Sequence, residues 1–135
     1  MKKILWITVL LFLLIAGTGI YLMNMPKTSI KNKSASMTMS AIELYKAYNQ
    51  DEAQGNQKYI SKIIEISGNV IEITKDEMDA DVLLLAAGNA PGGVLCTFEK
   101  GQDLSELKVN DQVKLKGQCT GMLMDVVLIK CILVE

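Results

Sequence analysis

Residues 64–74 read IEISGNVIEIT, and their pattern is the strongest indication of the class of fold. Isoleucine alternates with polar residues at its start and again at its end, which is the two-residue period of a β-strand. Gly68 and Asn69 interrupt the alternation in the middle. A glycine inside a long strand is typical of a bulge or a tight bend, so one strand can serve both halves of a small barrel. The segment therefore predicts a long, coiled first strand.

Further segments of strand character follow, separated by turn-forming residues. The predicted strands are 82–86, 94–98, 113–119 and 126–134. Residues 87–93 form a glycine-rich loop, and residues 121–124 form the turn of a terminal hairpin. Asp103 can cap a single helical turn that ends at Leu107. Five strands with a helical turn between the third and fourth describe a mainly β chain, a five-stranded OB-fold barrel.

One or two short helices are predicted before the barrel. Ser40 and Glu43 fit a capping box, in which each side chain accepts a hydrogen bond from the other residue's backbone N–H. Apolar residues then recur at helical spacing on one face: Ala41, Leu44, Tyr45 and Tyr48. Asn49 with Glu52 repeats the capping pattern, which predicts a second short helix that ends near Gly55.

Residues 4–23 form a run of twenty residues without a charged side chain, preceded by Lys2 and Lys3. As a helix this run spans about 30 Å, the thickness of the hydrocarbon core of a bilayer. It predicts a transmembrane helix that crosses the membrane once and holds the folded part on the periplasmic or extracytoplasmic side. A cleaved signal peptide stays open as the alternative, because residues 16–19 are small. Thr18 stands where a lipid-bearing cysteine would have to be, which argues against lipidation.

The chain thus divides into three parts. Residues 1–24 are the transmembrane anchor or signal segment, residues 25–39 are a linker by composition, and residues 40–135 are the OB-fold domain. The part from Ser34 onward holds nine lysines and fifteen acidic residues, a formal charge of −6, and the whole chain has no arginine. Such a domain repels phosphate backbones, so no nucleic-acid partner is expected.

The domain also resembles a known family. The resemblance covers residues 40–135 and rests on four segments: YISK at 59–62 leading into ISGNV at 66–70, VLCTF at 94–98, VKLKGQCTG at 113–121 and CILV at 131–134. In this combination they are similar to the tRNA-anticodon-like (tRNA_anti-like) OB-fold family. The resemblance implies an OB-fold in a secreted or anchored protein of the bacterial envelope, here a single-pass protein of the inner membrane. It implies no activity and no functional residue, because fold alone does not carry function.

All three cysteines fall on the inward side of their predicted strands, so packed thiols are the expected state. Outside the cytoplasm a disulfide becomes feasible. Cys119 and Cys131 are too far apart along the hairpin to bridge. Cys96 with Cys131 is the pair that a disulfide would join, because the third and fifth strands of this barrel are neighbours.

No metal, cofactor or catalytic site emerges from the sequence. The chain has no histidine and no CxxC pair, which excludes the usual zinc sites. Three Met-x-Met pairs could hold Cu(I): Met23/Met25, Met37/Met39 and Met122/Met124. Membrane contact for the first pair, a place in the linker for the second and packing at the barrel end for the third explain these methionines better, so no copper site is predicted. The acidic turn 76–81 lacks the glycine and distal glutamate of a calcium loop. No pair of acids has a companion nucleophile or base, so an enzyme is not expected.

The function predicted from the sequence is that of a membrane-tethered, non-enzymatic binding module for a protein, peptide or glycan. An OB-fold binds ligands mainly on its second and third strands and on the adjacent loops. The candidate residues on these loops are Ala87, Gly88, Asn89, Gly92, Gly93, Met122 and Met124. The alternative is a single-stranded nucleic-acid-binding OB-fold. It needs lysines and aromatic platforms, whereas residues 82–98 hold no lysine and only Phe98, which is predicted to point inward.

Overall fold

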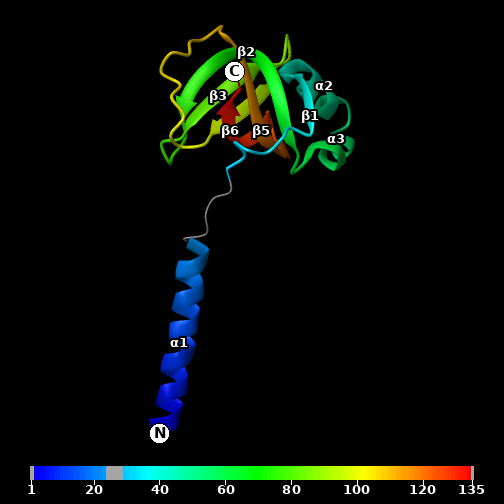
Figure 1. Cartoon of the computed structure of the whole chain (residues 1–135). Helices are drawn as coiled ribbons and strands as arrows, with labels where there is room; N and C mark the ends of the chain where they lie inside the picture. The colour runs from blue at the N-terminus through cyan, green and yellow to red at the C-terminus, as the bar shows by residue number, and fades with distance from the viewer. Residues whose placement is uncertain (1, 24–28, 135) are drawn as a thin grey trace.

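A computed structural model of the chain describes residues 2–23 and 29–134 (Figure 1). The elements are α1 Lys2–Met23, β1 Met37–Ser40, α2 Ala41–Gln50, α3 Glu52–Tyr59, β2 Ile63–Lys75, β3 Asp81–Ala86, β4 Gly93–Phe98, β5 Gln112–Met122 and β6 Val126–Leu133. α1 lies apart from the folded part, which contains all the other elements. Among the described residues, no helix combines the length and the apolar character that a membrane crossing requires.

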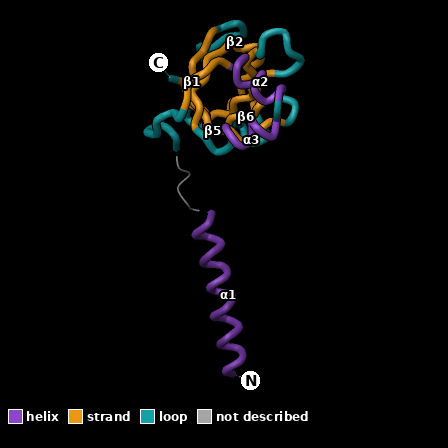
Figure 2. Tube along the Cα trace, turned by 90° about the vertical axis from the view of Figure 1, so that its right-hand side faces the viewer, coloured by secondary structure: helices purple, strands orange, loops and turns teal. Residues whose placement is uncertain are grey.

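Five strands, β2 to β6, close into a barrel, which Figure 2 shows as a ring with α2 and α3 beside it. The strand order is β1-β2-β3-β4-β6-β5, and β2 pairs with β5 to close the ring. β4 and β6 are parallel, whereas the other pairs within the ring are antiparallel. The predicted mainly β, five-stranded OB-fold barrel with preceding short helices is therefore confirmed.

β2 has the double role that the sequence predicted. Its first half pairs with β5 and its second half pairs with β3. The register shifts between Val70 and Glu72, so the bulge lies after Gly68 rather than at it. Gly68 has a different reason to be glycine: an added Cβ would lie 3.0 Å from the Cβ of Ala41. The glycine therefore lets the start of α2 pack closely on the barrel.

α2 begins with the predicted capping box. The backbone N–H of Glu43 donates to Ser40 Oγ over 3.2 Å, and the N–H of Ser40 donates to Glu43 Oε2 over 2.8 Å. The N–H of Ser40 first, and then the Ser40 hydroxyl, which donates to Glu43 Oε2 over 2.9 Å, hold the pKa of the Glu43 carboxyl below its ordinary value. Leu44 and Tyr48 on the predicted apolar face are buried in the barrel core.

The prediction for the second helix is wrong at both ends. Asp51, not Asn49, caps the helix by accepting a hydrogen bond from the N–H of Gln54 over 3.0 Å. The helix continues past Gly55 to Tyr59. An added Cβ at Gly55 would lie 2.8 Å from the ring of Tyr48. Gly55 is thus a contact point between the two helices and not a helix end.

Part of the predicted linker belongs to the fold. Residues 25–28 of that linker lie outside the described residues, but residues 29–36 run along the barrel, and we call them the strap. Ile30 in the strap is buried. Ser29 donates to Glu99 Oε2 over 2.6 Å, and Lys116 Nζ donates to the backbone carbonyls of Lys31 and Lys33, each over 2.9 Å. β1 then follows and pairs with β2 in parallel.

The connection between β4 and β5 contains no helix. Asp103 Oδ1 accepts hydrogen bonds from the backbone N–H and the hydroxyl of Ser105, at 3.0 and 2.6 Å. The hydrogen bond from the Ser105 hydroxyl, and to a lesser extent the one from the Ser105 N–H, holds the pKa of the Asp103 carboxyl below its ordinary value. A single turn closes when the N–H of Leu107 donates to the carbonyl of Leu104. Asp103 therefore stabilises a turn and does not cap a helix. In place of the predicted helical turn, the structure has a loop that one backbone hydrogen bond closes.

Candidate ligand-binding surface

The outer surface of β3 and β4 carries a row of aliphatic side chains. Leu84 pairs with Leu95 across β3 and β4, and Leu95 pairs with Val127 across β4 and β6. All three side chains are partly exposed, and we call them the aliphatic row. Paired residues on neighbouring strands project to the same face of a sheet, so the row is continuous over three strands. It offers apolar contact area on the face that OB-folds generally use.

Aromatic rings are absent from this surface because the folded part uses them in its core. Every aromatic residue in the described range 29–134 is at most 6% exposed: Tyr45, Tyr48, Tyr59 and Phe98. Phe98 points inward, as the alternation predicts. The rings of Tyr48 and Tyr59 contact each other with their centroids 5.7 Å apart, between α2 and α3. Within the described range 29–134, no aromatic ring is therefore exposed beside the aliphatic row to stack on a ligand.

The loop between β3 and β4 contains four of the candidate residues, and a fifth, Gly93, is the first residue of β4. Ala87 is buried and belongs to the core, whereas Gly88 and Asn89 are exposed. Gly88 has a φ of 71°, a conformation that favours glycine. Gly92 and Gly93 lie against the hairpin turn: a Cβ at Gly92 would lie 2.8 Å from the carbonyl oxygen of Met124. The structure thus places this loop beside the β5–β6 turn.

The β5–β6 turn ends in exposed apolar residues. Leu123 is 89% exposed and Met124 is 83% exposed, whereas Met122 is partly buried against the core. Asp125 fastens the turn, because its Oδ1 accepts a hydrogen bond from the N–H of Gly93 over 2.7 Å. This hydrogen bond holds the β5–β6 turn beside the β3–β4 loop. The part of both loops in ligand binding stays a prediction.

Two surface hollows contain three of the seven candidate residues. The larger hollow has a volume of about 370 Å³ and includes Gly88 and Asn89. The smaller one has a volume of about 320 Å³ and includes Met122. Sequence reasoning missed the other polar residues of the larger hollow, Ser40, Ser67, Asn69 and Gln112. They come from three strands, β1, β2 and β5, and only the strand register brings them together, so no local pattern in the sequence marks them as one site.

The smaller hollow lies between α3 and the β5–β6 turn. Ile60, Leu123 and Val127 make it largely apolar. Asn56 Oδ1 is buried there without a hydrogen-bond partner within the described residues. A Cβ at Gly121 would lie 3.4 Å from this oxygen. The hollow therefore continues the apolar surface of the aliphatic row around the barrel, since Val127 belongs to both.

All three cysteines are buried and are free thiols in this structure. Burial first, and then a hydrogen bond with Cys96, raises the pKa of the Cys131 thiol well above its ordinary value. Cys96 and Cys131 are thus neighbours, and the disulfide between them stays a prediction for the oxidised protein. The Sγ of Cys119 contacts the hydroxyl of Tyr48 at 3.4 Å. Burial and this contact raise the pKa of Tyr48.

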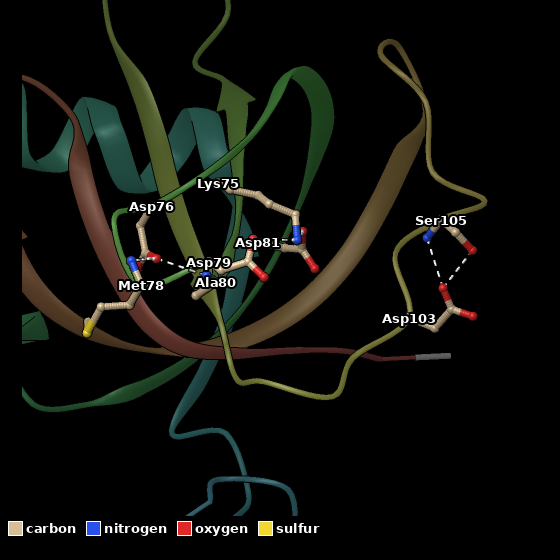
Figure 3. A network of polar contacts seen from close by, with 8 residues as sticks. All are labelled: Lys75, Asp76, Met78, Asp79, Ala80, Asp81, Asp103 and Ser105. Carbon is tan, nitrogen blue, oxygen red and sulfur yellow. Dashed lines mark hydrogen bonds and ion pairs between the residues drawn. The ribbon is translucent and has the colours of Figure 1, made fainter.

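The acidic turn between β2 and β3 is occupied by its own hydrogen bonds, which Figure 3 shows. Asp76 Oδ1 accepts from the N–H groups of Met78 and Ala80, at 2.8 and 2.9 Å. Lys75 Nζ lies 3.0 Å from Asp79 and 3.7 Å from Asp81. The pKa of Lys75 is raised, mainly by its hydrogen bond with Asp79. Across the described residues, histidine, cysteine and carboxylate side chains form no group of three that suits a metal ion.

The methionine pairs differ in their surroundings. Met37 and Met39 in β1 are partly buried and pack against the core, whereas Met122 and Met124 have separate surroundings. Of the first pair, Met25 lies outside the described residues. Packing against the core therefore accounts for Met37 and Met39.

Comparisons with known proteins identify the family. The tRNA_anti-like family matches residues 1–133, nearly the whole chain. The chain belongs to the tRNA_anti-like family. The family resemblance drawn from residues 40–135 is thereby confirmed, and the match extends to the N-terminal segment as well. The folded part is an OB-fold domain like those that bind tRNA anticodons. No curated protein sequence matches the chain.

Solved structures are similar to the chain at low sequence identity. One is the crystal structure of a candidate nucleic acid-binding lipoprotein from Klebsiella pneumoniae subsp. pneumoniae, with 14% identity and a TM-score of 0.62. The similarity covers 74% of this chain and 93% of that chain. Another is an OBody bound to hen egg-white lysozyme, with 13% identity, a TM-score of 0.42, and 56% and 83% coverage of the two chains. At these identities the first likeness shows the fold alone.

Proposed function

We propose that this tRNA_anti-like protein is a membrane-tethered, extracytoplasmic binding module, without catalytic activity, that recognises its partner on the aliphatic row and the loops beside it. One observation carries the proposal: on the outer surface of β3 and β4, the partly exposed side chains of Leu84 and Leu95 lie side by side. Contiguous exposed apolar side chains are characteristic of surfaces that bind other molecules. The exposed Leu123 and Met124 extend this apolar surface at one end.

The proposed tether is the segment of residues 4–23, which holds twenty residues without a charge and lies within the helix α1. Large apolar side chains of α1 are exposed on all sides, Trp6 and Phe12 among them. A helix that is apolar all round needs an apolar environment. The positive charges of Lys2 and Lys3 favour retention of the N-terminus inside and of the barrel outside, in the envelope of a bacterium.

The absence of catalysis is supported by the uses that the ionisable groups already have. The carboxyl groups with a lowered pKa, Glu43 and Asp103, cap a helix and close a turn. The raised pKa of Cys131 belongs to a buried thiol without access to a substrate. Catalytic sites, by contrast, place shifted groups together in a cleft.

A second candidate, binding of single-stranded nucleic acid, is favoured by the description of the Klebsiella neighbour. Such binding would have to proceed without the exposed aromatic rings and the positive charge on which it usually depends. Base stacking needs exposed rings, and the four rings of the described folded part are buried. Phosphate contacts need cations, and the part from Ser34 onward has a formal charge of −6. The apolar-surface proposal therefore ranks first.

The test is capture of the partner from native membranes by the full-length protein. The double variant Leu84→Ser/Leu95→Ser removes the centre of the aliphatic row and is expected to lose the bound partner. Ile71→Ser is the matched control, because Ile71 is an exposed aliphatic residue on the β2 bulge, outside the row. The same preparation tests the tether, since the protein should fractionate with the membranes. Equal capture by the double variant and the wild type would overturn the proposal.

A further inference from the structure

The larger hollow is formed by cross-strand pairs of hydrogen-bonding side chains. Ser40 pairs with Ser67 across β1 and β2, and Asn69 pairs with Gln112 across β2 and β5. Asn89 joins them from the β3–β4 loop. The side chains of such pairs project to the same face, roughly 5 Å apart. Three carboxamides and two hydroxyls, from four separate segments of the chain, therefore converge on one hollow of about 370 Å³, which we call the carboxamide hollow.

Most of these polar groups are not used by the protein. Ser40 belongs to the capping box, so its hydroxyl is occupied. The side chains of Ser67, Asn69, Asn89 and Gln112 have no hydrogen bond to any other described residue. Each carboxamide offers two donors and one acceptor oxygen, and a hydroxyl offers both functions. The carboxamide hollow thus presents many free donors and acceptors, all of which face solvent or a ligand.

The carboxamide hollow contains no charged side chain, although the domain has nine lysines and fifteen acidic residues. The carboxylate of the adjacent Glu43 is occupied by hydrogen bonds from Ser40. An ionic ligand would therefore lose its hydration without gaining a counter-charge, which is unfavourable. A site of neutral donors and acceptors selects a ligand that is itself neutral and rich in hydroxyl or amide groups.

The remaining lining is small or apolar. Ile42 is 52% exposed at the start of α2, and Ala86 lies at the end of β3. At Gly88 an added Cβ would lie 4.0 Å from the side chain of Ile42, so the absence of a side chain at this position keeps the space open. A sugar ring combines a C–H face with hydroxyls at its edge, which matches an apolar wall surrounded by carboxamides. The volume is at the lower end of ligand sites, which suits one or two sugar rings.

We propose that the carboxamide hollow binds a neutral, N-acetylated sugar unit of a glycan. The proposal rests on the proposed function, because it names the ligand class of a hollow whose Ala86 lies two positions from Leu84 of the aliphatic row on β3. An N-acetylated sugar supplies hydroxyls and an acetamide, and both can exchange donor and acceptor bonds with Asn69, Asn89 and Gln112. A peptide is the less suitable ligand, since extended peptides are held mainly by main-chain bonds at a sheet edge, whereas this hollow offers side chains.

The experiment titrates the ¹⁵N-labelled full chain, in detergent micelles, with N,N′-diacetylchitobiose and follows the side-chain NH₂ signals of asparagine and glutamine. Saturable shifts are expected at Asn69, Asn89 and Gln112. Gln112→Ala should weaken the affinity about tenfold or more, because it removes donors and an acceptor from the centre of the site. Gln57→Ala is the matched control, since Gln57 is an exposed carboxamide on α3, outside the hollow. The affinity of this variant for the disaccharide should equal that of the wild type.

Several results would overturn the proposal: no shift with the disaccharide up to about 10 mM, equal weakening by Gln57→Ala, or saturable shifts with a neutral tripeptide but not with the sugar. Failure of the proposed function gives a different pattern. The Leu84→Ser/Leu95→Ser variant leaves all polar residues of the carboxamide hollow in place. If that variant captures the membrane partner as the wild type does, the aliphatic row is not the binding surface, while the disaccharide titration still tests the hollow.

Discussion

At the scale of single residues, the alternation of the strands predicts which side chains enter the core. Leu115 and Cys119 in β5 are fully buried, as predicted, and Lys114 between the inward positions points to solvent. The same sequence logic fails for glycine. Gly68 and Gly55 are both points where another element packs closely, against Ala41 and Tyr48. Glycine occurs at bends, helix ends and close contacts alike, so the reason for a particular glycine becomes visible only when the neighbouring element is known.

Gly55→Ala tests the packing role of this glycine. Alanine favours a helix over glycine by about 1 kcal/mol, which alone would stabilise α3. The added Cβ would lie 2.8 Å from the ring of Tyr48, and overpacking of this kind costs roughly 1–3 kcal/mol. We therefore expect a net loss of stability in urea unfolding. In a Tyr48→Leu background the substitution should cost less or become stabilising, because the ring is gone. Stabilisation of the otherwise unchanged protein by Gly55→Ala would contradict the packing role.

At the scale of elements, the sequence predicts those with a strong local pattern, such as α2. It misses β1 and the strap, which have no such pattern. The capping box at Ser40 marks the start of α2 because both of its hydrogen bonds are local. β1 has only four residues, MTMS, and its partner lies 27 positions away in β2. The strap has no period, and distant side chains hold it, those of Glu99 and Lys116. Composition therefore predicted a linker, although tertiary contacts make the strap part of the fold.

Ile30→Ala tests whether the strap is part of the folded domain. Ile30 is 2% exposed, and its N–H donates to Glu99 Oε1 over 3.3 Å. Truncation of a buried isoleucine removes apolar contact and leaves a cavity, so we expect a loss of roughly 2–4 kcal/mol in urea unfolding. Asn32→Ala, in the exposed part of the same strap, should change the stability by less than about 0.5 kcal/mol. A similar, small effect of both substitutions would mean that the strap does not contribute to the fold.

At the scale of the whole molecule, the fold is predictable from the sequence and the site is not. The β-strand period, the turns and the family motifs are all readable along the chain. The carboxamide hollow depends on the register of β1 on β2 and of β2 on β5, which places Ser67 and Gln112 on one surface although 45 positions separate them. The predicted loop residues Gly88 and Asn89 belong to this hollow, but the position of Met122 in another hollow shows that the predicted set is not a single site.

The distribution of charge and aromatic rings over the whole molecule yields the last prediction. The full chain, in detergent micelles, should show no salt-sensitive binding to a fluorescent oligo-dT or oligo-U at micromolar concentration and low ionic strength. These conditions favour phosphate contacts most, because few counterions compete with the protein. The part from Ser34 onward has a formal charge of −6, and Tyr45, Tyr48, Tyr59 and Phe98 are buried, so neither phosphates nor bases find their usual partners.

Fluorescence anisotropy over a series of salt concentrations measures this directly. Each phosphate contact in a single-stranded complex lowers the logarithm of the affinity by about 0.7 per tenfold increase in salt, so even a few contacts give a clear slope. A micromolar complex with such a slope would contradict the ranking of the two candidate functions and favour the nucleic-acid alternative. In that case Leu84→Ser/Leu95→Ser distinguishes the surfaces: loss of the complex would assign nucleic-acid binding to the outer face of β3 and β4. Retention of the complex would place it elsewhere, where the lysines of the strap, Lys31 and Lys33, are exposed.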